Sequence, residues 1–418
     1  MPSADPNRAL SQGALLAMMA ALFGLGLTNI FMRSTLGVIA PELAGDLGLS
    51  PFVLGLTGSA YFFAYAVFQI PSGMMLDRFG PRLTICTLFV VTTFGAWLFS
   101  VAESDIAVVI GRIFMGLGCA AVFPGAIMLF ARFYPPDRLP SVTGSLNSFA
   151  MLGTFLATFP LAYLVTQIGW RDSFVLIAIC AAVISGFAFL TLRDWPVTPD
   201  EAPRQLREGP REVLAGVLQA IRTPYALNIA SGGIALSAGN IFLGVWGGPY
   251  LHDVHGLSET QRGEVLMFMA FAGVAGHFIF GKLARVLNTL KGLVLFGAAG
   301  AVVIMILFAT LTEPSRLTVT VLFTVLGFVC GYPGIMMSHA RAIMPDHLMG
   351  RGLTVVNTGI MISIAVMQTA VGWVIGVHGA ADADSYRTAF IFIAVMAALS
   401  FVIYSRAEDR KPRSMGPS

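Results

Sequence analysis

The chain has 418 residues, of which 56% are hydrophobic and only 11% are charged, and its formal net charge is +3. Soluble domains usually carry about 25% charged residues, so this composition excludes a water-soluble enzyme built from several domains. The sequence also lacks the alternating segments of about ten residues that a transmembrane β-barrel uses. Because each membrane-spanning helix needs about 20 apolar residues, the sequence predicts an all-α integral membrane protein.

Twelve apolar stretches follow one another along the chain. The first half contains them at residues 14–40, 51–75, 83–101, 106–131, 141–167 and 173–192, and the second half at 225–250, 263–281, 292–311, 317–340, 353–377 and 388–405. A polar, proline-rich segment separates the two sets. We therefore expect twelve transmembrane helices in two pseudo-symmetric six-helix bundles, residues 1–192 and 223–405, with a cytoplasmic linker at 193–222 and a cytoplasmic tail at 406–418.

The basic residues predict the orientation, because cytoplasmic loops carry an excess of Lys and Arg. With the N-terminus inside, the basic residues that fall outside the cell are Arg171, Arg262, Arg316 and Arg387. Arg33 and Arg112 lie within predicted spans, and the others fall on cytoplasmic segments. Both termini are therefore expected in the cytoplasm. The excess of Arg over Lys and the abundance of Ala and Gly are typical of GC-rich bacterial genomes, so we expect a multi-pass protein of the bacterial inner membrane.

Short motifs of the first half recur in the second half at a nearly constant offset. Phe123-Pro124-Gly125 recurs as Tyr332-Pro333-Gly334, and Gly48-Leu49-Ser50 recurs as Gly256-Leu257-Ser258. Such internal repetition is typical of transporters built from two parallel repeats.

Two motifs carry a family resemblance. Residues 73–82 read GMMLDRFGPR, which resembles the GxxxDRxGxR signature of the major facilitator superfamily, and residues 112–118 read RIFMGLG, which is similar to RxxxGxG of the same family. Together with the spans and the repeat, the resemblance covers essentially the whole chain. It implies the major facilitator fold, with a cavity between two bundles that opens alternately to each side of the membrane.

The first motif supplies a candidate gate at the cytoplasmic rim. Gly73 permits close helix approach, and Asp77 and Arg78 can pair with Arg132, Arg138 or a helix end. The resemblance implies a latch that stabilises the outward-facing state, and the alternative is an ordinary turn with solvated charges. The predicted gating residues are Gly73, Asp77, Arg78, Gly80, Arg82 and Arg132.

Arg33 and Arg112 lie within spans that contain no carboxylate. An arginine in the hydrocarbon costs at least about 2.5–3.5 kcal/mol, so water in a cavity, backbone carbonyls or an anionic substrate must offset that cost. A guanidinium suits carboxylate and phosphate oxygens. We expect a transporter of a small organic or inorganic anion, with Arg33 as the principal contact and Arg112 assisting. The alternative is a transporter of a neutral or cationic solute, including an exporter, in which both arginines are structural.

The surroundings of Arg33, from Phe31 to Leu43, look like the first helix of the anion:cation symporters and the organophosphate:phosphate antiporters. In those families the corresponding arginine contacts the substrate anion. Met32 and Cys119 stand where the proton-coupled symporters tend to carry acidic residues, and the seventh stretch lacks the antiporters' second arginine. Exchange, uniport and proton symport through His277 therefore all remain open.

Further polar residues share helical faces and complete the expected binding site. Polar groups in spans prefer the bundle interior or water, although Asn and Gln also serve as hydrogen-bond partners between helices. His277 lies deep in an apolar stretch, where it can take part in proton or substrate binding or stay a neutral core imidazole. The other candidates for substrate binding are Asn29, Tyr61, Tyr65, Asn147, Asn240, Asn357 and Gln368.

The sequence predicts no cofactor, no metal site and no catalytic constellation. The cysteines lie in apolar stretches without CxxC spacing, which is typical of buried small residues; they are Cys86, Cys119, Cys180 and Cys330. The expected partners are a small-molecule substrate and the lipid bilayer, with no nucleic acid, and the chain is expected to be a monomer and not an enzyme. A non-transporting membrane sensor on the same fold is the alternative from another class.

Overall fold

The computed structural model describes residues 11–135, 137–194, 210–312, 314–345, 348–377 and 382–410, and in these ranges every regular element is a helix. Residues 195–209 of the predicted linker and residues 411–418 of the predicted tail lie outside the described residues. The helices of the first half are α1 (Gln12–Ser34), α2 (Leu36–Leu47), α3 (Pro51–Phe79), α4 (Pro81–Ser100), α5 (Asp105–Cys119), α6 (Val122–Phe133), α7 (Leu139–Ala150), α8 (Leu152–Leu156) and α9 (Phe159–Thr191).

The second half begins with α10 (Pro210–Ile221), a short helix that precedes the long apolar ones. The elements that follow are α11 (Ala226–Ile241), the π-helix η3 (Phe242–Trp246), α12 (Gly247–Asp253), α13 (Glu259–Leu287), α14 (Lys291–Thr310), α15 (Arg316–Val329), α16 (Pro333–Ile343), α17 (Met349–Val377) and α18 (Ala383–Ser405).

Eleven helical segments in the described residues are long and apolar enough to cross a membrane. The prediction of a membrane protein is thereby confirmed, whereas twelve spans stay a prediction. The difference lies in the fifth apolar stretch, 141–167, which is divided among α7, α8 and the first part of α9. Pro160 accounts for one of these breaks, because proline is tolerated in the first turn of a helix but not in its interior. At Gly169, with φ 78° and ψ 165°, α9 changes direction and the next helix begins.

The repeat found in the sequence reappears in the local structure. Gly48 and Gly256 both adopt positive φ angles, 63° and 62°, immediately before a long helix of their half. Ser50 caps α3 by accepting a hydrogen bond from the backbone N–H of Val53 at 3.3 Å, and Ser258 forms a capping box at the start of α13. The motif Gly-Leu-Ser therefore encodes the same turn and helix start twice, since glycine adopts positive φ readily and serine is a favoured N-cap.

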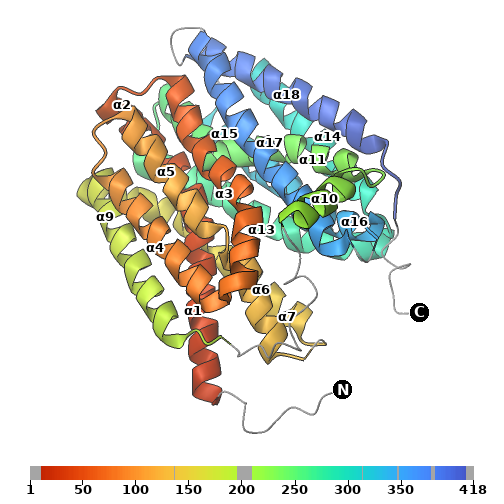
Figure 1. The fold of residues 1–418 in the computed structure, drawn as a ribbon. Coiled ribbons are helices and arrows are strands. Elements are labelled where there is room, and N and C mark those ends of the chain that lie inside the picture. Colours follow the sequence, from red (N-terminus) through yellow and green to blue (C-terminus); the bar gives the residue numbers. More distant parts are fainter. Residues whose placement is uncertain are drawn as a thin grey trace.

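The two halves of the chain occupy different sides of the molecule. Figure 1 shows the first half, red to yellow-green, on one side and the second half, green to blue, on the other, and α3 and α17 make the most extensive contact between them. A Cβ atom on Gly55 would lie 2.6 Å from the carbonyl oxygen of Gln368, and one on Gly372 would lie 2.5 Å from that of Pro51. Only glycine permits this approach, as expected for closely packed membrane helices.

The outer surface carries many large apolar side chains, among them Leu190, Trp373 and Val377. An exposed apolar surface of this kind suits contact with lipid. The prediction that all four cysteines are buried is wrong for Cys180, which is exposed on α9, whereas Cys86, Cys119 and Cys330 are buried. The apolar stretch that contains Cys180 has two faces, and composition alone does not say which face points outward.

Candidate functional site

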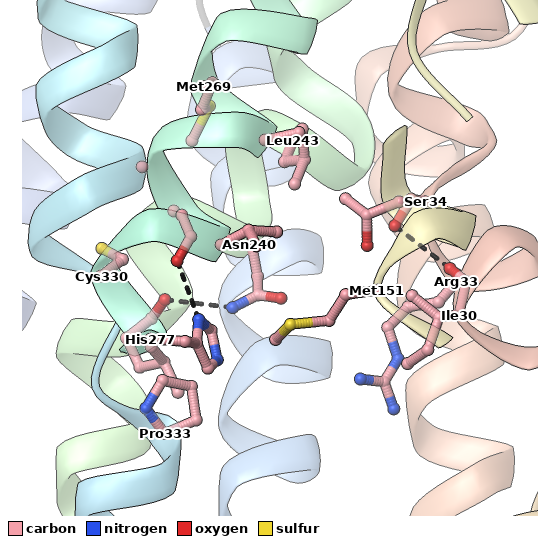
Figure 2. Close-up of a pocket in the computed structure, with 17 residues that line it drawn as sticks. Ile30, Arg33, Ser34, Met151, Asn240, Leu243, Met269, His277, Cys330 and Pro333 are labelled. Carbon is pink, nitrogen blue, oxygen red and sulfur yellow. Dashed lines mark hydrogen bonds between the residues drawn. The ribbon is translucent and has the colours of Figure 1, made fainter. Parts of the chain in front are cut away.

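A cavity of about 240 Å³ lies between the two halves of the chain (Figure 2). Helix α1 contributes Arg33, the segment around α8 contributes Met151 and Thr154, α11 contributes Asn240, and α13 contributes His277. The other lining residues are Ile30, Ser34, Leu236, Gly239, Leu243, Met269, Ala270, Gly273, Val274, Gly327, Cys330 and Pro333. Three of the predicted substrate contacts, Arg33, Asn240 and His277, therefore share one cavity.

Arg33 enters this cavity without a carboxylate partner among the described residues. Its Nη2 atom donates only a weak hydrogen bond, to the sulfur of Met361 at 3.7 Å. The guanidinium carbon lies 5.5 Å from the ring centre of Phe62 and 5.6 Å from that of Tyr65. Its Nε atom is buried and has no hydrogen-bond partner among the described residues. The aromatic faces hold the charge by cation–π contact, and the guanidinium retains N–H donors that have no acceptor among the described residues.

Asn240 and His277 form the opposite wall of the cavity. The Nδ2 atom of Asn240 donates to the carbonyl oxygen of Leu236 at 3.2 Å. The Nδ1 atom of His277 lies 2.9 Å from the carbonyl oxygen of Gly273. His277 also lines a second cavity of about 310 Å³, together with Gly281 and Gly334. The site thus combines a cation on one wall with neutral polar groups on the other.

Arg112 does not line the cavity. It is 1% exposed, its Nη1 atom donates to the carbonyl oxygen of Met32 at 2.7 Å, and its Nε atom donates to that of Thr57 at 3.4 Å. Its guanidinium carbon lies 5.0 Å from the ring centre of Tyr61. Backbone carbonyls and an aromatic ring therefore offset part of the cost of this buried cation, and the contacts tie α5 to α1 and α3. The Nη2 atom of Arg112 is buried without a hydrogen-bond partner among the described residues.

Asn29 and Tyr61 belong to the same buried network. The Nδ2 atom of Asn29 donates to the carbonyl oxygen of Cys119 at 2.9 Å, and the Tyr61 hydroxyl lies 3.2 Å from the Oδ1 atom of Asn29. Tyr61 stacks on Tyr65 with their ring centres 6.4 Å apart. In this conformation the network fixes the face of α1 that carries Arg33, and Tyr65 is the member that reaches the guanidinium of Arg33.

The remaining predicted contacts lie away from the cavity lining. Gln368 is fully buried, and both polar atoms of its side chain have no hydrogen-bond partner among the described residues. A Cβ atom on Gly58 would lie 2.7 Å from its Oε1 atom, so Gln368 sits in the tight contact between α3 and α17. Asn147 is exposed on α7 and Asn357 is half-buried on α17.

Arg82 of the predicted gating motif makes its contacts within the first half of the chain. Its backbone N–H donates to the Oδ1 atom of Asp194 at 2.9 Å, and its Nη2 atom donates to the carbonyl oxygen of Phe189 at 2.9 Å. A Cβ atom on Gly80 would lie 3.1 Å from the Asp194 carboxylate, whereas one on Gly73 would meet no atom within 4 Å. Sequence reasoning missed Asp194, because no local pattern pairs it with a helix start that lies more than a hundred residues earlier in the chain.

Arg78 and Arg132 of the same motif set lie near the ends of α3 and α6. The Arg78 guanidinium carbon lies 5.5 Å from the ring centre of the neighbouring Phe79. Arg132 is half-buried. The contacts of Arg78 and Arg82 lie within the first half of the chain, and the role of the latch predicted for this motif stays a prediction.

The tightest connection between the halves lies at the other end of the molecule, which we call the closed end: α2, α12 and the first turn of α13. Arg262 on α13 forms an ion pair with Glu42 on α2, and their side chains are 1% and 20% exposed. A Cβ atom on Gly37 would overlap the carbonyl oxygen of Leu243, and one on Gly248 would overlap that of Gly37. The two halves are therefore joined at this end by backbone contact and by a charge pair.

Sequence reasoning placed Arg262 on an outer loop and did not connect it with Glu42. The two residues lie 220 positions apart, so no spacing rule relates them. The one available signal was the repeat, which aligns the end of α2 and the start of α3 with the end of α12 and the start of α13 and so brings both residues to the same end of the molecule.

The fold and the cavity define a class: a polytopic helical membrane protein with a solute-sized cavity between its two halves. The model of the Major Facilitator Superfamily matches residues 22–368, and the chain therefore belongs to this superfamily of transporters. The resemblance carried by residues 73–82 and 112–118 is confirmed.

Relatives and structural neighbours agree with this membership. The chain is 26% identical over 273 residues to the hexuronate transporter of Bacillus subtilis (strain 168), an alignment that spans 63% of this chain and 65% of that protein. It is 22% identical over 407 residues to a protein of Escherichia coli (strain K12) described as a probable galactarate/D-glucarate transporter, with 89% of this chain and 88% of that one aligned. A bacterial homologue of the human lysosomal transporter Spinster, in an inward-facing and occupied conformation, superposes with a TM-score of 0.75 at 18% identity, over 95% of this chain and 97% of that one.

Proposed function

We propose that this protein is a secondary transporter that moves a small organic anion across the bacterial inner membrane by alternating access. The observation that carries the proposal is Arg33, a cation in the cavity wall that has no carboxylate partner among the described residues. A carboxylate is the natural partner, because charge-assisted pairs between guanidinium and carboxylate are frequently bidentate and about twice as strong as neutral hydrogen bonds. The names of the relatives, which are those of hexuronate and galactarate/D-glucarate transporters, support a sugar acid.

In this proposal the closed end faces the periplasm, and the conformation is inward-facing. The distribution of Lys and Arg supports this orientation, since it puts Arg262 on the outer side and most of the other basic residues on the inner side. The ion pair between Glu42 and Arg262 then acts as the outer gate. The motif around Asp77 acts at the inner face, in the opposite state.

Arg112, Asn29 and Tyr61 are proposed to position α1. Their hydrogen bonds go to backbone carbonyls and to one another, which leaves them without a group that faces the cavity in this conformation. Arg33 is then the principal contact, and Tyr65 holds its guanidinium. Because the wall of the cavity contains no carboxylate among the described residues, the fixed charge of Arg33 favours exchange of one anion for another, since the empty cavity would reorient with an unneutralised cation.

The test is uptake of labelled sugar acids into proteoliposomes, with and without internal anion and with and without a pH gradient. We expect saturable uptake of at least one sugar acid that is stimulated by internal anion. Arg33→Gln should abolish it, and Arg33→Lys should retain part of it, since lysine keeps the charge but not the planar fork.

The matched control is Arg387→Gln, which removes an exposed arginine that pairs with Asp384 on the surface of α18. This variant should transport as the unmodified protein does. Saturable transport of a cation or of a neutral solute that survives Arg33→Gln would overturn the proposal. Loss of a proton-driven component in His277→Gln would replace exchange by proton symport.

A further inference from the structure

The two walls of the cavity differ in what they offer a ligand. On the side of α1, Arg33 presents N–H donors that carry a full positive charge. On the side of α11 and α13, the polar side chains are Asn240 and His277, and no lysine or arginine lines the cavity there among the described residues. Arg33, Asn240 and His277 line one cavity of about 240 Å³, so a solute that fills it contacts both walls.

The hydrogen bond of His277 fixes which of its ring atoms faces a ligand. A backbone carbonyl only accepts hydrogen bonds, so the Nδ1 atom, 2.9 Å from the oxygen of Gly273, carries the proton. The ring has no carboxylate partner among the described residues, and a second cation beside Arg33 in the membrane interior would be costly. In the neutral ring, the Nε2 atom then has a lone pair and acts as an acceptor.

The side-chain amide of Asn240, like the ring of His277, presents an acceptor to the cavity. Its Nδ2 atom donates to the carbonyl oxygen of Leu236 at 3.2 Å, which identifies the nitrogen side of the amide. Figure 2 shows the Oδ1 atom on the side that faces Met151 and Arg33. The amide oxygen therefore points into the cavity as a second acceptor.

We propose that the cavity selects a monoanion that carries hydroxyl groups, with its carboxylate at Arg33 and its hydroxyls donating to the Nε2 atom of His277 and the Oδ1 atom of Asn240. This inference rests on the proposed function and specifies its substrate class. A dicarboxylate of the same length would place its second charge against two acceptors, where no cation among the described lining residues offsets it, and burying an unpaired charge is strongly unfavourable. A fatty acid of the same length would leave both acceptors unpaired, and sites built for a hydroxyl reject analogues that lack it.

The experiment compares D-gluconate with two probes that each differ from it in one chemical feature. D-Gluconate carries one carboxylate and several hydroxyls, D-glucarate replaces the terminal hydroxymethyl group by a second carboxylate, and hexanoate lacks the hydroxyls. Each is offered as a competitor against D-gluconate exchange in proteoliposomes at pH 8, where the histidine ring stays neutral and both carboxylates of D-glucarate are ionised. We expect D-glucarate and hexanoate to compete at least tenfold more weakly than D-gluconate.

Two variants test the assignment of the acceptors. Asn240→Lys and His277→Lys each add a cation to the second wall, and either one should raise the competition by D-glucarate relative to D-gluconate by tenfold or more. His277→Leu should bring D-gluconate and hexanoate closer together, because the Nε2 acceptor is removed. Two lysine variants are used so that a failure of one to fold does not decide the result.

The outcomes separate this inference from the proposed function. Equal or stronger competition by D-glucarate in the unmodified protein, lost in Arg33→Gln, would overturn the monoanion inference and leave the anion transporter in place. The monoanion inference is also overturned if both lysine variants fold and neither gains competition by D-glucarate. Absence of any Arg33-dependent anion exchange, by contrast, would refute the proposed function itself.

Discussion

Replacing Arg262 by Gln should shift the protein toward the conformation in which the closed end opens. Arg262 is 1% exposed and its ion pair with Glu42 joins α13 of the second half to α2 of the first. When the halves separate at this end, both side chains regain water. The variant removes the attraction only from the closed conformation, and it leaves Glu42 there as a largely buried charge without its partner.

The magnitude follows from the burial of the pair. Breaking a buried ion pair by removing one partner costs about 3–5 kcal/mol. The side chain of Glu42 is 20% exposed and can be partly rehydrated, so the lower limit of about 3 kcal/mol is the appropriate value. Because a tenfold change in an equilibrium constant corresponds to about 1.4 kcal/mol, the ratio of open to closed molecules at this end should rise roughly 100-fold.

The assay is a distance distribution from pulsed electron paramagnetic resonance between spin labels on Val101 and Leu311. Both side chains are exposed, and they follow the ends of α4 and α14. The exposed Cys180 is replaced by Ser so that only the two engineered cysteines carry a label. A population with a longer distance should be minor in the unmodified protein and major in Arg262→Gln.

The matched control is Arg316→Gln, which breaks the ion pair with Glu264 in which both side chains are more than 40% exposed. Surface pairs contribute about 0–1 kcal/mol, so this variant should leave the distribution nearly unchanged. Combining Glu42→Gln with Arg262→Gln should open the closed end less than Arg262→Gln alone, since no buried charge is left unpaired. An unchanged distribution in a folded Arg262→Gln variant would refute the reasoning, and so would additive effects of the two substitutions.

Three further outcomes follow from the packing. Gly37→Ala should open the closed end and slow transport, because its Cβ would overlap the carbonyl oxygen of Leu243, whereas Gly45→Ala on the same helix meets no atom within 4 Å and should have no effect in the same spin-label assay. Arg112→Lys should lower the melting temperature in detergent by a few degrees and leave the preference among anions unchanged, because lysine cannot reproduce two directed contacts to carbonyls. Gly73→Ala should not destabilise the present conformation but should slow transport, and faster transport would contradict the latch.

The sequence predicted the membrane helices and part of the cavity because both depend on position along a helix. Apolar stretches of sufficient length give the spans, and the depth of Arg33 and His277 within those stretches identifies polar groups that need a cavity or a partner. Asn240 was found as a polar side chain within the apolar stretch 225–250. These are local properties, so they can be read from the sequence without knowledge of the tertiary structure.

The partners of the buried charges could not be predicted, because depth gives the cost of a charge and not the group that offsets it. Arg33 and Arg112 lie at similar depth in the sequence, yet Arg112 donates to two backbone carbonyls while Arg33 faces the cavity. The pair of Glu42 and Arg262 joins residues of different halves, and in the sequence both resemble ordinary residues near the membrane surface. The break in the fifth stretch was missed because its composition is apolar, although Pro160 was a local signal.

Glycines at the two ends of the molecule allow a direct test of alternating access. Gly37 is packed against backbone at the closed end, and Gly73 of the signature motif has open space around it at the opposite end of α3. If the signature motif assembles only in the other conformation, a methyl group at position 73 destabilises that conformation and one at position 37 destabilises this one. The two substitutions should therefore shift the distance between Val101 and Leu311 in opposite directions, toward shorter values for Gly73→Ala and longer values for Gly37→Ala. Shifts of the same sign would mean that the two ends do not open in alternation.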